Sequence, residues 1–367
     1  MAPAPTEASP ATRSFARRLL RLYAEAETVT MIDLGHRTGL WEALAAGPGT
    51  AAEIAARAGV DARYAEEWLS AIACARIARY APEGRRFSLS SARARCLAGP
   101  SIYNLAPASR MVTLGARQGA RLAHAFRTGR GISPAAYVEE FPAVMEEINR
   151  RRYDALLASA YVRCAPGLAT ALSRGIRVLD VGTGRGYPLL LLARAFPRSW
   201  FLGIDPDARS VALARRRAAR ERLPNLSYAE GTLEDLDPGD RFDAVTLFDV
   251  IHDLSRPAQV LGGIARRLRP GGILLATEPR ASSDLSQNLG RSGATYLYGI
   301  SVTYCLPVSR FGGPGGLGAC GGEARTRALL AAAGFTRIRT REAPGNALGL
   351  VYSARRGLPV PAGEAGR

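Results

Sequence analysis

Apolar and polar positions alternate with a helical period over the first part of the chain. Residues 15–46 carry apolar side chains at helical spacing. Thr50-Ala51-Ala52-Glu53 has the form of a capping box, which begins a short helix, and Gly59 ends that helix. Asp61 is a residue type that caps a further helix. The larger apolar residues of that helix share one side: Trp68, Leu69, Ile72 and Ile77.

Two short strand-like runs follow, Ile77–Tyr80 and Arg86–Leu89, joined by the turn residues Pro82-Glu83-Gly84. Helix, turn, helix and hairpin is the order of a winged helix, which can place its second helix in a DNA groove. Between Thr50 and Arg79, however, four arginines are matched by four acidic residues, so the net charge is zero. Phosphate contact requires an excess of cations. We therefore expect a role in folding or dimerisation and no nucleic-acid partner.

Beyond residue 165 the pattern changes to short apolar runs that alternate with helical ones. The helical runs include 189–196 and 207–222, and a Pro-Gly-Gly turn at 270–272 precedes the last strand. Such alternation predicts an α/β fold with a Rossmann-like, doubly wound, mostly parallel sheet, whose ligand lies at the carboxyl ends of the strands. The predicted strands are Arg177–Val181, Trp200–Ile204, Leu226–Ala229, Ala244–Phe248 and Ile273–Thr277.

These patterns predict four parts of the chain. A winged-helix and dimerisation domain covers residues 1–110, connecting helices with breaks near Gly129 and Pro142 cover 111–165, the α/β domain covers 166–356, and a disordered tail covers 357–367. The apolar helical positions of residues 15–110 have few residues to cover them, which predicts a homodimer formed by this region.

The first predicted strand runs into a glycine-rich loop, which is the main candidate binding site. Asp180 precedes the loop, and Gly182, Gly184 and Gly186 give it the spacing G-x-G-x-G. Glycines are needed where a strand turns sharply into a helix and a ligand approaches the backbone. Asp205 ends the next strand, where an acid can hold both hydroxyls of a ribose. Tyr187 stands where the third glycine of a dinucleotide-binding loop would fall, which disfavours a pyrophosphate ligand.

Composition narrows the class of protein. The 367 residues suggest two domains, and 47% apolar with 22% charged residues is typical of a globular protein. The chain has no Lys, so its net charge of +17 comes from Arg, which we interpret as solvated surface charge. The apolar runs are too short to span a membrane. Five scattered cysteines suggest neither disulfides nor a metal site and fit a cytoplasmic location.

With these motifs in place, residues 25–355 resemble the class I S-adenosylmethionine-dependent methyltransferases that carry an N-terminal winged helix. The resemblance implies that Val178–Gly186 lies against the methionine part of S-adenosylmethionine and that Asp205 holds its ribose, with Pro206 beside the adenine. Thr232, followed by Leu233, replaces the acid that usually holds the adenine amino group.

The same resemblance covers the segment Phe248-Asp249-Val250-Ile251-His252-Asp253, in which Phe248 and Asp249 would line the cofactor. In O-methylating members the His of the His-Asp pair is the general base, and the acid matched by Glu278 orients it. A bacterial subgroup often has His and Trp where this chain has Tyr304 and Gly321, which implies an altered acceptor pocket.

The implied reaction is an in-line methyl transfer from a sulfonium to a small-molecule acceptor, most simply a hydroxyl of a phenolic or polyketide-like natural product. A hydroxyl must lose its proton, for which His252 is suited, although a structural His bonded to a loop is the alternative. Asp253 can orient a backbone or cap a helix instead, and Glu278 can pair with a buried Arg. Transfer to nitrogen or carbon, or a member recruited to another reaction, stays open. A regulator that binds DNA through the winged helix and senses a ligand is the alternative of another class.

Overall fold

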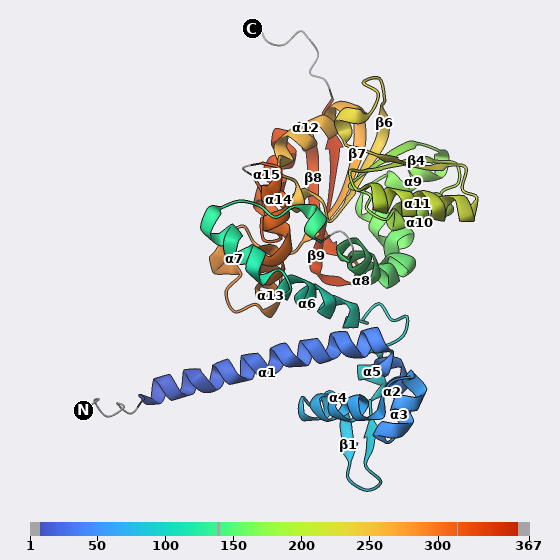
Figure 1. Ribbon diagram of the computed structural model, residues 1–367. Coiled ribbons are helices and arrows are strands. Elements are labelled where there is room, and N and C mark those ends of the chain that lie inside the picture. The colour runs from blue at the N-terminus through green and yellow to red at the C-terminus, as the bar shows by residue number, and fades with distance from the viewer. Residues whose placement is uncertain (1–7, 138–139, 314, 359–367) are drawn as a thin grey trace. The chain divides into compact units, whose positions relative to one another are not determined.

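The computed structural model of the chain describes residues 8–137, 140–313 and 315–358 (Figure 1). Internal contacts divide it into two units, Met1–Thr113 and Leu114–Arg367. The disordered tail was predicted for residues 357–367. Most of it, residues 359–367, lies outside the described residues.

The N-terminal unit has the element order of a winged helix. Thr50 and Glu53 form both hydrogen bonds of a capping box, and the Asp61 side chain accepts from the backbone N–H groups of Arg63 and Tyr64. The order predicted from the sequence is therefore present. The elements are α1 (Pro10–Thr38), α2 (Leu40–Ala45), α3 (Ala51–Ala58), α4 (Ala62–Cys74), β1 (Arg79–Ala81), β2 (Arg86–Ser88) and α5 (Ser91–Leu97).

Two tryptophans centre the core of this unit. The rings of Trp41 and Trp68 meet edge to face with centroids 4.6 Å apart, and each indole N–H donates to a carbonyl of α1. Gly35 is required at this crossing, because a Cβ there would lie 2.4 Å from the Trp68 ring. The first half of α1 instead leaves large apolar side chains exposed, among them Phe15 and Tyr23.

The C-terminal unit is built on a seven-stranded sheet with the order β5-β4-β3-β6-β7-β9-β8. The five strands from β5 to β7 are parallel, and β9 is antiparallel to both of its neighbours. The Pro-Gly-Gly segment lies inside β7 as an irregularity in its register with β6, because Phe242 pairs with Leu268 but Ala244 with Ile273. The strands are β3 (Arg177–Val181), β4 (Trp200–Asp205), β5 (Leu226–Glu230), β6 (Phe242–Phe248), β7 (Leu268–Pro279), β8 (Phe335–Ala343) and β9 (Asn346–Arg356).

Helices cover both faces of this sheet, as in a doubly wound fold (Figure 1). One face packs against α9 (Leu168–Arg174), α10 (Tyr187–Ala195) and α11 (Ala208–Glu221), and the other against α12 (Pro257–Arg267) and α15 (Glu323–Ala332). Each face has its own cluster of fully buried aliphatic and aromatic side chains. The remaining helices are α6 (Ser109–Ala116), α7 (Gly119–Thr128), α8 (Phe141–Leu156), α13 (Ser292–Ile300) and α14 (Leu306–Phe311).

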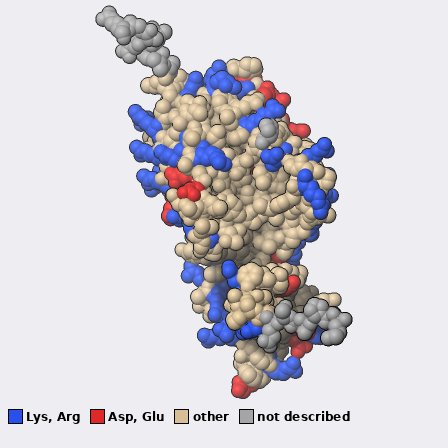
Figure 2. All heavy atoms as spheres, turned by 90° about the vertical axis from the view of Figure 1, so that its left-hand side faces the viewer, with Lys and Arg blue, Asp and Glu red and all other residues tan. Residues whose placement is uncertain are grey.

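Two expectations from composition concern the structure: that the Arg side chains are surface charge, and that the apolar runs are too short to span a membrane. On the face drawn in Figure 2, Arg side chains are scattered with wide uncharged areas between them. Among the described residues no single helix is long and apolar enough to cross a membrane. One sharply bent pair, Phe141–Cys164 with Leu168–Arg174, passes that test only when taken together.

Candidate functional site

The candidate site lies along the carboxyl edge of the parallel strands. Because β3, β4, β6 and β7 run in the same direction, the residues that follow them meet at one edge of the sheet. The glycine loop follows β3, Asp205 ends β4, Asp249 follows β6, and Glu278 is near the end of β7. The sheet thus brings together the residues that the sequence singled out.

All three glycines of the loop have left-handed backbone angles, with φ of 71°, 52° and 75° for Gly182, Gly184 and Gly186. A Cβ at Gly182 would collide with Val250, and one at Gly186 would lie 2.6 Å from the Tyr228 ring. At Gly184, by contrast, no described heavy atom lies within 4 Å of that position. The loop therefore offers open backbone at Gly184, where a ligand can approach.

Asp205 closes the loop from the side of β4. Its Oδ2 accepts the Gly184 N–H at 2.7 Å, and its Oδ1 accepts the Asp207 N–H at 2.9 Å. Burial raises the pKa of Asp205, and these two hydrogen bonds oppose that rise. Pro206, next along the chain, is exposed. The carboxylate thus lies within hydrogen-bond distance of the loop glycine whose Cβ position is open.

Asp180 lies beneath the loop and is only 1% exposed. Its Oδ1 accepts the Thr246 hydroxyl at 2.6 Å. Burial raises the pKa of Asp180 to about 7, although hydrogen bonds to the carboxylate oppose this. In this position Asp180 joins β3 to β6 directly before the glycine loop begins.

The residues after β5 lie in a short turn. Thr232 is exposed, and its hydroxyl bonds to the carboxylates of Glu234 and Asp235. Leu233 is 6% exposed and belongs to the core cluster under α12. The turn is therefore already stabilised by its own acids, and the Leu233 side chain packs inward.

The turn after β6 is tied to β7. Asp249 has a left-handed φ of 59°, its N–H donates to the Thr277 carbonyl, and its Oδ1 accepts the Thr277 hydroxyl at 3.2 Å. Burial and then the charge of Glu278 raise the pKa of Asp249. Phe248 packs its ring against the edge of Tyr153 on α8. A strained non-glycine residue held this firmly is typical of functional turns.

His252 and Glu278 form a buried pair. His252 Nδ1 lies 2.7 Å from Glu278 Oε2, and the same carboxylate accepts the backbone N–H groups of Ile251 and His252. His252 Nε2 lies 3.3 Å from Asp253 Oδ1. Burial alone would lower the pKa of His252, but Asp253 and Glu278 together hold it well above its usual value. Glu278 thus both fixes the imidazole and favours its positive charge.

Arg152 is a candidate that the sequence analysis missed. It lies on α8, is 9% exposed, and its Nε has no hydrogen-bond partner among the described residues. Its other end bonds to Asn149, and its charge opposes the burial that raises the pKa of Tyr161 to about 12. The sequence signal that could have found Arg152 is its place on the buried side of an amphipathic helix. Asn149, Arg152 and Tyr153 are spaced so that they share one side of α8.

Tyr304 and Gly321 stand where the resembled bacterial subgroup often has His and Trp, and both lie in packed surroundings. The Tyr304 ring is nearly parallel to Phe141 and meets Tyr137 edge to face. A Cβ at Gly321 would lie 2.7 Å from that of Leu317, so a Trp there would require this loop to move. Tyr304 thus lies in an aromatic cluster with Phe141 and Tyr137.

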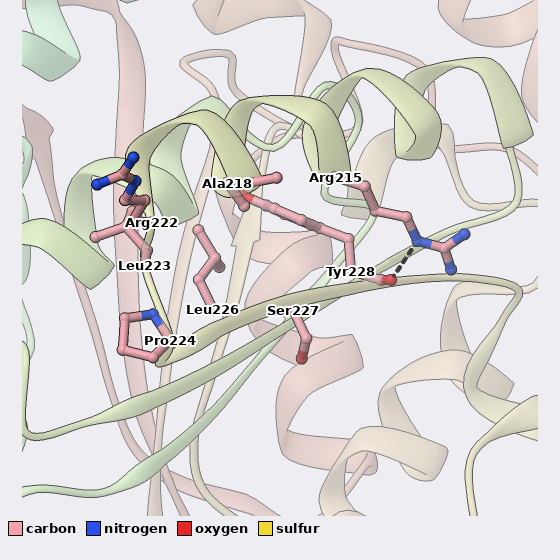
Figure 3. Close-up of a pocket in the computed structure, with 9 residues that line it drawn as sticks. Arg215, Ala218, Arg222, Leu223, Pro224, Leu226, Ser227 and Tyr228 are labelled. Atoms are coloured by element: carbon pink, nitrogen blue, oxygen red, sulfur yellow. Dashed lines mark hydrogen bonds between the residues drawn. The ribbon is translucent and has the colours of Figure 1, made fainter.

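A surface hollow elsewhere on the unit does not belong to this site. It has a volume of about 570 Å³ and lies between α11 and the first residues of β5, with Leu223, Pro224 and Tyr228 in its wall (Figure 3). Arg215 at its rim donates from Nε to the Tyr228 carbonyl. Apart from Tyr228, whose hydroxyl donates to the Gly186 carbonyl, its wall belongs to α11, the turn after α11 and the first residues of β5, away from the strand ends that carry the candidate residues.

Comparisons with known proteins bear on the family and the fold. A family model described as a methyltransferase domain matches residues 172–306, and an Rv2258c-like winged HTH domain matches residues 26–99. A ubiquinone biosynthesis O-methyltransferase of Rhodopseudomonas palustris strain HaA2 is 37% identical over 103 residues, which are 28% of this chain and 39% of that protein. The chain thus spans about two fifths of the length of the curated relatives it matches.

Two solved structures share the fold over nearly the whole chain. Mitomycin 7-O-methyltransferase is 21% identical with a TM-score of 0.67, covering 95% of this chain and all of that one. Human N-acetylserotonin methyltransferase, solved with S-adenosylmethionine, is 20% identical with a TM-score of 0.65, covering 97% of this chain and all of that one. The predicted fold is therefore confirmed. Residues 172–306 match a methyltransferase domain and residues 26–99 a winged HTH domain, in the order that the resemblance implied.

Proposed function

Because the chain is built as a class I methyltransferase domain behind a winged helix, we propose that it transfers the methyl group of S-adenosylmethionine to a hydroxyl of a small molecule. The observation that carries this proposal is the buried pair of His252 and Glu278, 2.7 Å apart at the sheet edge that also carries the glycine loop. A phenolic or polyketide-like natural product is the acceptor we propose. Cytoplasmic location stays a prediction.

The residues present fit the proposed cofactor. S-adenosylmethionine carries a ribose, a carboxylate and a sulfonium, and when bound it supplies the methyl group and the leaving sulfide. Asp205 would hold the ribose hydroxyls, while the open backbone at Gly184 leaves room for the methionine part. The unpartnered Nε of Arg152 fits the carboxylate, because a buried guanidinium requires an anionic partner. Asp180 would act through the loop that it precedes.

His252 is the proposed general base. Its Nδ1 donates to Glu278, which leaves Nε2 to take the acceptor proton. The pKa of His252 is held above its usual value by two carboxylates, so this His must first lose a proton before it can act. The positive sulfonium of a bound cofactor would favour that loss. Asp253 faces Nε2 and would share the proton once it is transferred.

Binding and turnover test the proposal separately. Calorimetry should detect S-adenosylmethionine binding to the full chain, and mass spectrometry of a panel of phenols should detect products heavier by one methylene. Loss of a general base costs on the order of a hundredfold to ten-thousandfold in rate. His252→Ala should therefore slow turnover by at least that lower bound while cofactor affinity stays close to native. Retention of more than about a third of native turnover would exclude the base.

A matched control separates the base from general damage. His124 lies on α7, outside the candidate site, so His124→Ala should leave turnover close to native. If His252→Ala and His124→Ala behave alike, the enzyme works by alignment alone, as expected for an acceptor such as an amine that is already nucleophilic.

A further inference from the structure

Three donor atoms converge beside the proposed base. The ligand atoms of His252, Asp253 and Cys305 all lie within 4.8 Å of one another. His252 is 7% and Cys305 4% exposed, so two of the three are withdrawn from water. Cys305 is the last residue of a π-helical turn, Ser301–Cys305, that leads into α14. Such turns are rare and are frequently found at functional sites.

One of the donor atoms in this cluster lacks a hydrogen bond within the part of the chain that the structure describes. Asp253 Oδ1 is buried and has no hydrogen-bond partner among the described residues, although His252 Nε2 is 3.3 Å away. Because Glu278 holds Nδ1–H, the neutral ring has its lone pair on Nε2, 3.3 Å from this oxygen. Two lone pairs this close in a buried place repel each other, and a cation bound to both removes that repulsion. A proton on Nε2 is one such cation, and a metal ion is another.

We propose that His252, Asp253 and Cys305 bind a zinc ion, and that the ion competes with the acceptor for His252 Nε2. Imidazole, carboxylate and thiolate are together the donors that Zn²⁺ prefers, whereas Mg²⁺ and Ca²⁺ select oxygen alone. The Glu278 carboxylate on Nδ1 is the outer hydrogen bond that metal-bound histidines usually make. The sequence showed no ligand set because Cys305 is far from His252 along the chain.

The binding step balances in charge and protons. Zn²⁺ replaces the proton of the Cys305 thiol and any proton held on His252 Nε2, and both pass to solvent. The thiolate and the Asp253 carboxylate then neutralise the two positive charges of the ion. Bonds of about 2.0–2.3 Å to the three donors leave a fourth tetrahedral position for water. The ion thus binds without cofactor or acceptor. Only the expected inhibition rests on the proposed function.

Cobalt provides the test, because Co²⁺ substitutes for Zn²⁺ and a cobalt–thiolate bond absorbs in the near ultraviolet. The full chain, without cofactor or acceptor, is titrated with Co²⁺ under reducing conditions. We expect one charge-transfer band that saturates at one ion per chain and disappears when Zn²⁺ is added. Absence of the band from the native chain would overturn the proposal.

Variants identify the ligands. Cys305→Ser should remove the band, and Asp253→Asn should weaken Co²⁺ binding by about tenfold or more while the band remains. Cys164→Ser, which changes a half-buried cysteine outside the cluster, should leave the titration as in the native chain. Circular dichroism shows whether each variant is folded, and His252→Gln provides a second loss of ligand if Cys305→Ser does not fold. A band that survives both Cys305→Ser and His252→Gln assigns the ion to another site and refutes the proposal.

Inhibition is measured separately from binding. Micromolar Zn²⁺ should slow methyl transfer, and a chelator should restore it. If no acceptor is ever methylated, the proposed function fails while the cobalt titration still decides the metal site. If transfer proceeds and Zn²⁺ binds without slowing it, the ion does not occupy His252 Nε2, and the competition proposed here is wrong.

Discussion

Asp205 is the residue whose change tests cofactor binding at the glycine loop. Its two carboxylate oxygens accept the Gly184 and Asp207 N–H groups, and the same oxygens would bind the ribose hydroxyls. Charge-assisted hydrogen bonds contribute roughly 1.5–3 kcal/mol each. Asp205→Ala removes two such bonds and should therefore weaken S-adenosylmethionine binding by at least about a hundredfold in calorimetry. Asp237→Ala, in an exposed turn of the same unit, is the control, and equal affinities in the two variants would contradict the assignment.

Asp180 should make stability depend on pH. Its pKa is about 7 in the folded chain because of burial, and near 4 in the unfolded chain. Below pH 4 the group is protonated in both states. As pH rises from 4 to 7, only the unfolded state loses the proton, so the free energy of unfolding falls. Asp180→Asn removes this loss and can still accept the Thr246 hydroxyl.

The measurement compares melting temperatures at several pH values. The variant should gain on the native chain between pH 5 and 8, and the difference should level off above pH 8. A constant difference across this range would mean that Asp180 is ionised throughout. Thr246→Val, which removes the hydrogen-bond donor, should lower stability most where Asp180 is ionised.

At the scale of elements, α8 is joined to the glycine loop through Glu146. This side chain is 8% exposed and pairs with Arg217 on α11 at 2.7 Å, with Arg185 in the loop at 3.2 Å and with Arg150 on its own helix. Glu146→Gln leaves three guanidinium groups without their shared counter-charge. Because the arginines are partly exposed, we expect a loss of about 1–3 kcal/mol in unfolding free energy.

The same variant should also weaken cofactor binding a few-fold, because Arg185 lies between the loop glycines. Glu221→Gln, which breaks a more exposed ion pair with Arg194, is the control and should change neither property measurably. For the native chain and the two variants, chemical denaturation measures the free energy of unfolding and calorimetry measures the cofactor affinity. If Glu146→Gln loses stability but binds the cofactor as the native chain does, α8 supports the fold without positioning the loop.

How far the sequence predicted these elements depends on how local each signal is. The β3 loop and the end of β4 were predicted because glycine spacing and a short apolar strand are read within a few residues. The Pro-Gly-Gly segment was expected as a turn before β7 but lies within it, because pairing with β6 continues beyond it. Arg152 and Cys305 gave no motif. Their place in the site depends on packing between segments distant in the chain.

At the scale of the whole molecule, the property to test is the oligomeric state of the chain. The N-terminal half of α1 carries Phe15, Leu19, Leu22 and Tyr23, whose spacing places them along one side of the helix. Phe15, Leu22 and Tyr23 are 56%, 47% and 61% exposed, and only Asp33 and Gly35 of this 29-residue helix are buried. A long helix with an uncovered apolar stripe is costly in water.

We therefore expect the homodimer predicted for residues 15–110, with the α1 stripe as its centre. Light scattering on the full chain should give twice the 39.0 kDa mass at micromolar concentration. Leu22→Glu with Tyr23→Glu should produce monomers, since charge on the stripe opposes its burial. Leu285→Glu, an equally exposed apolar position in the C-terminal unit, should leave the dimer intact. A native chain that scatters as a monomer would contradict the predicted dimer, and a stripe variant that stays dimeric would show that the α1 stripe is not its centre.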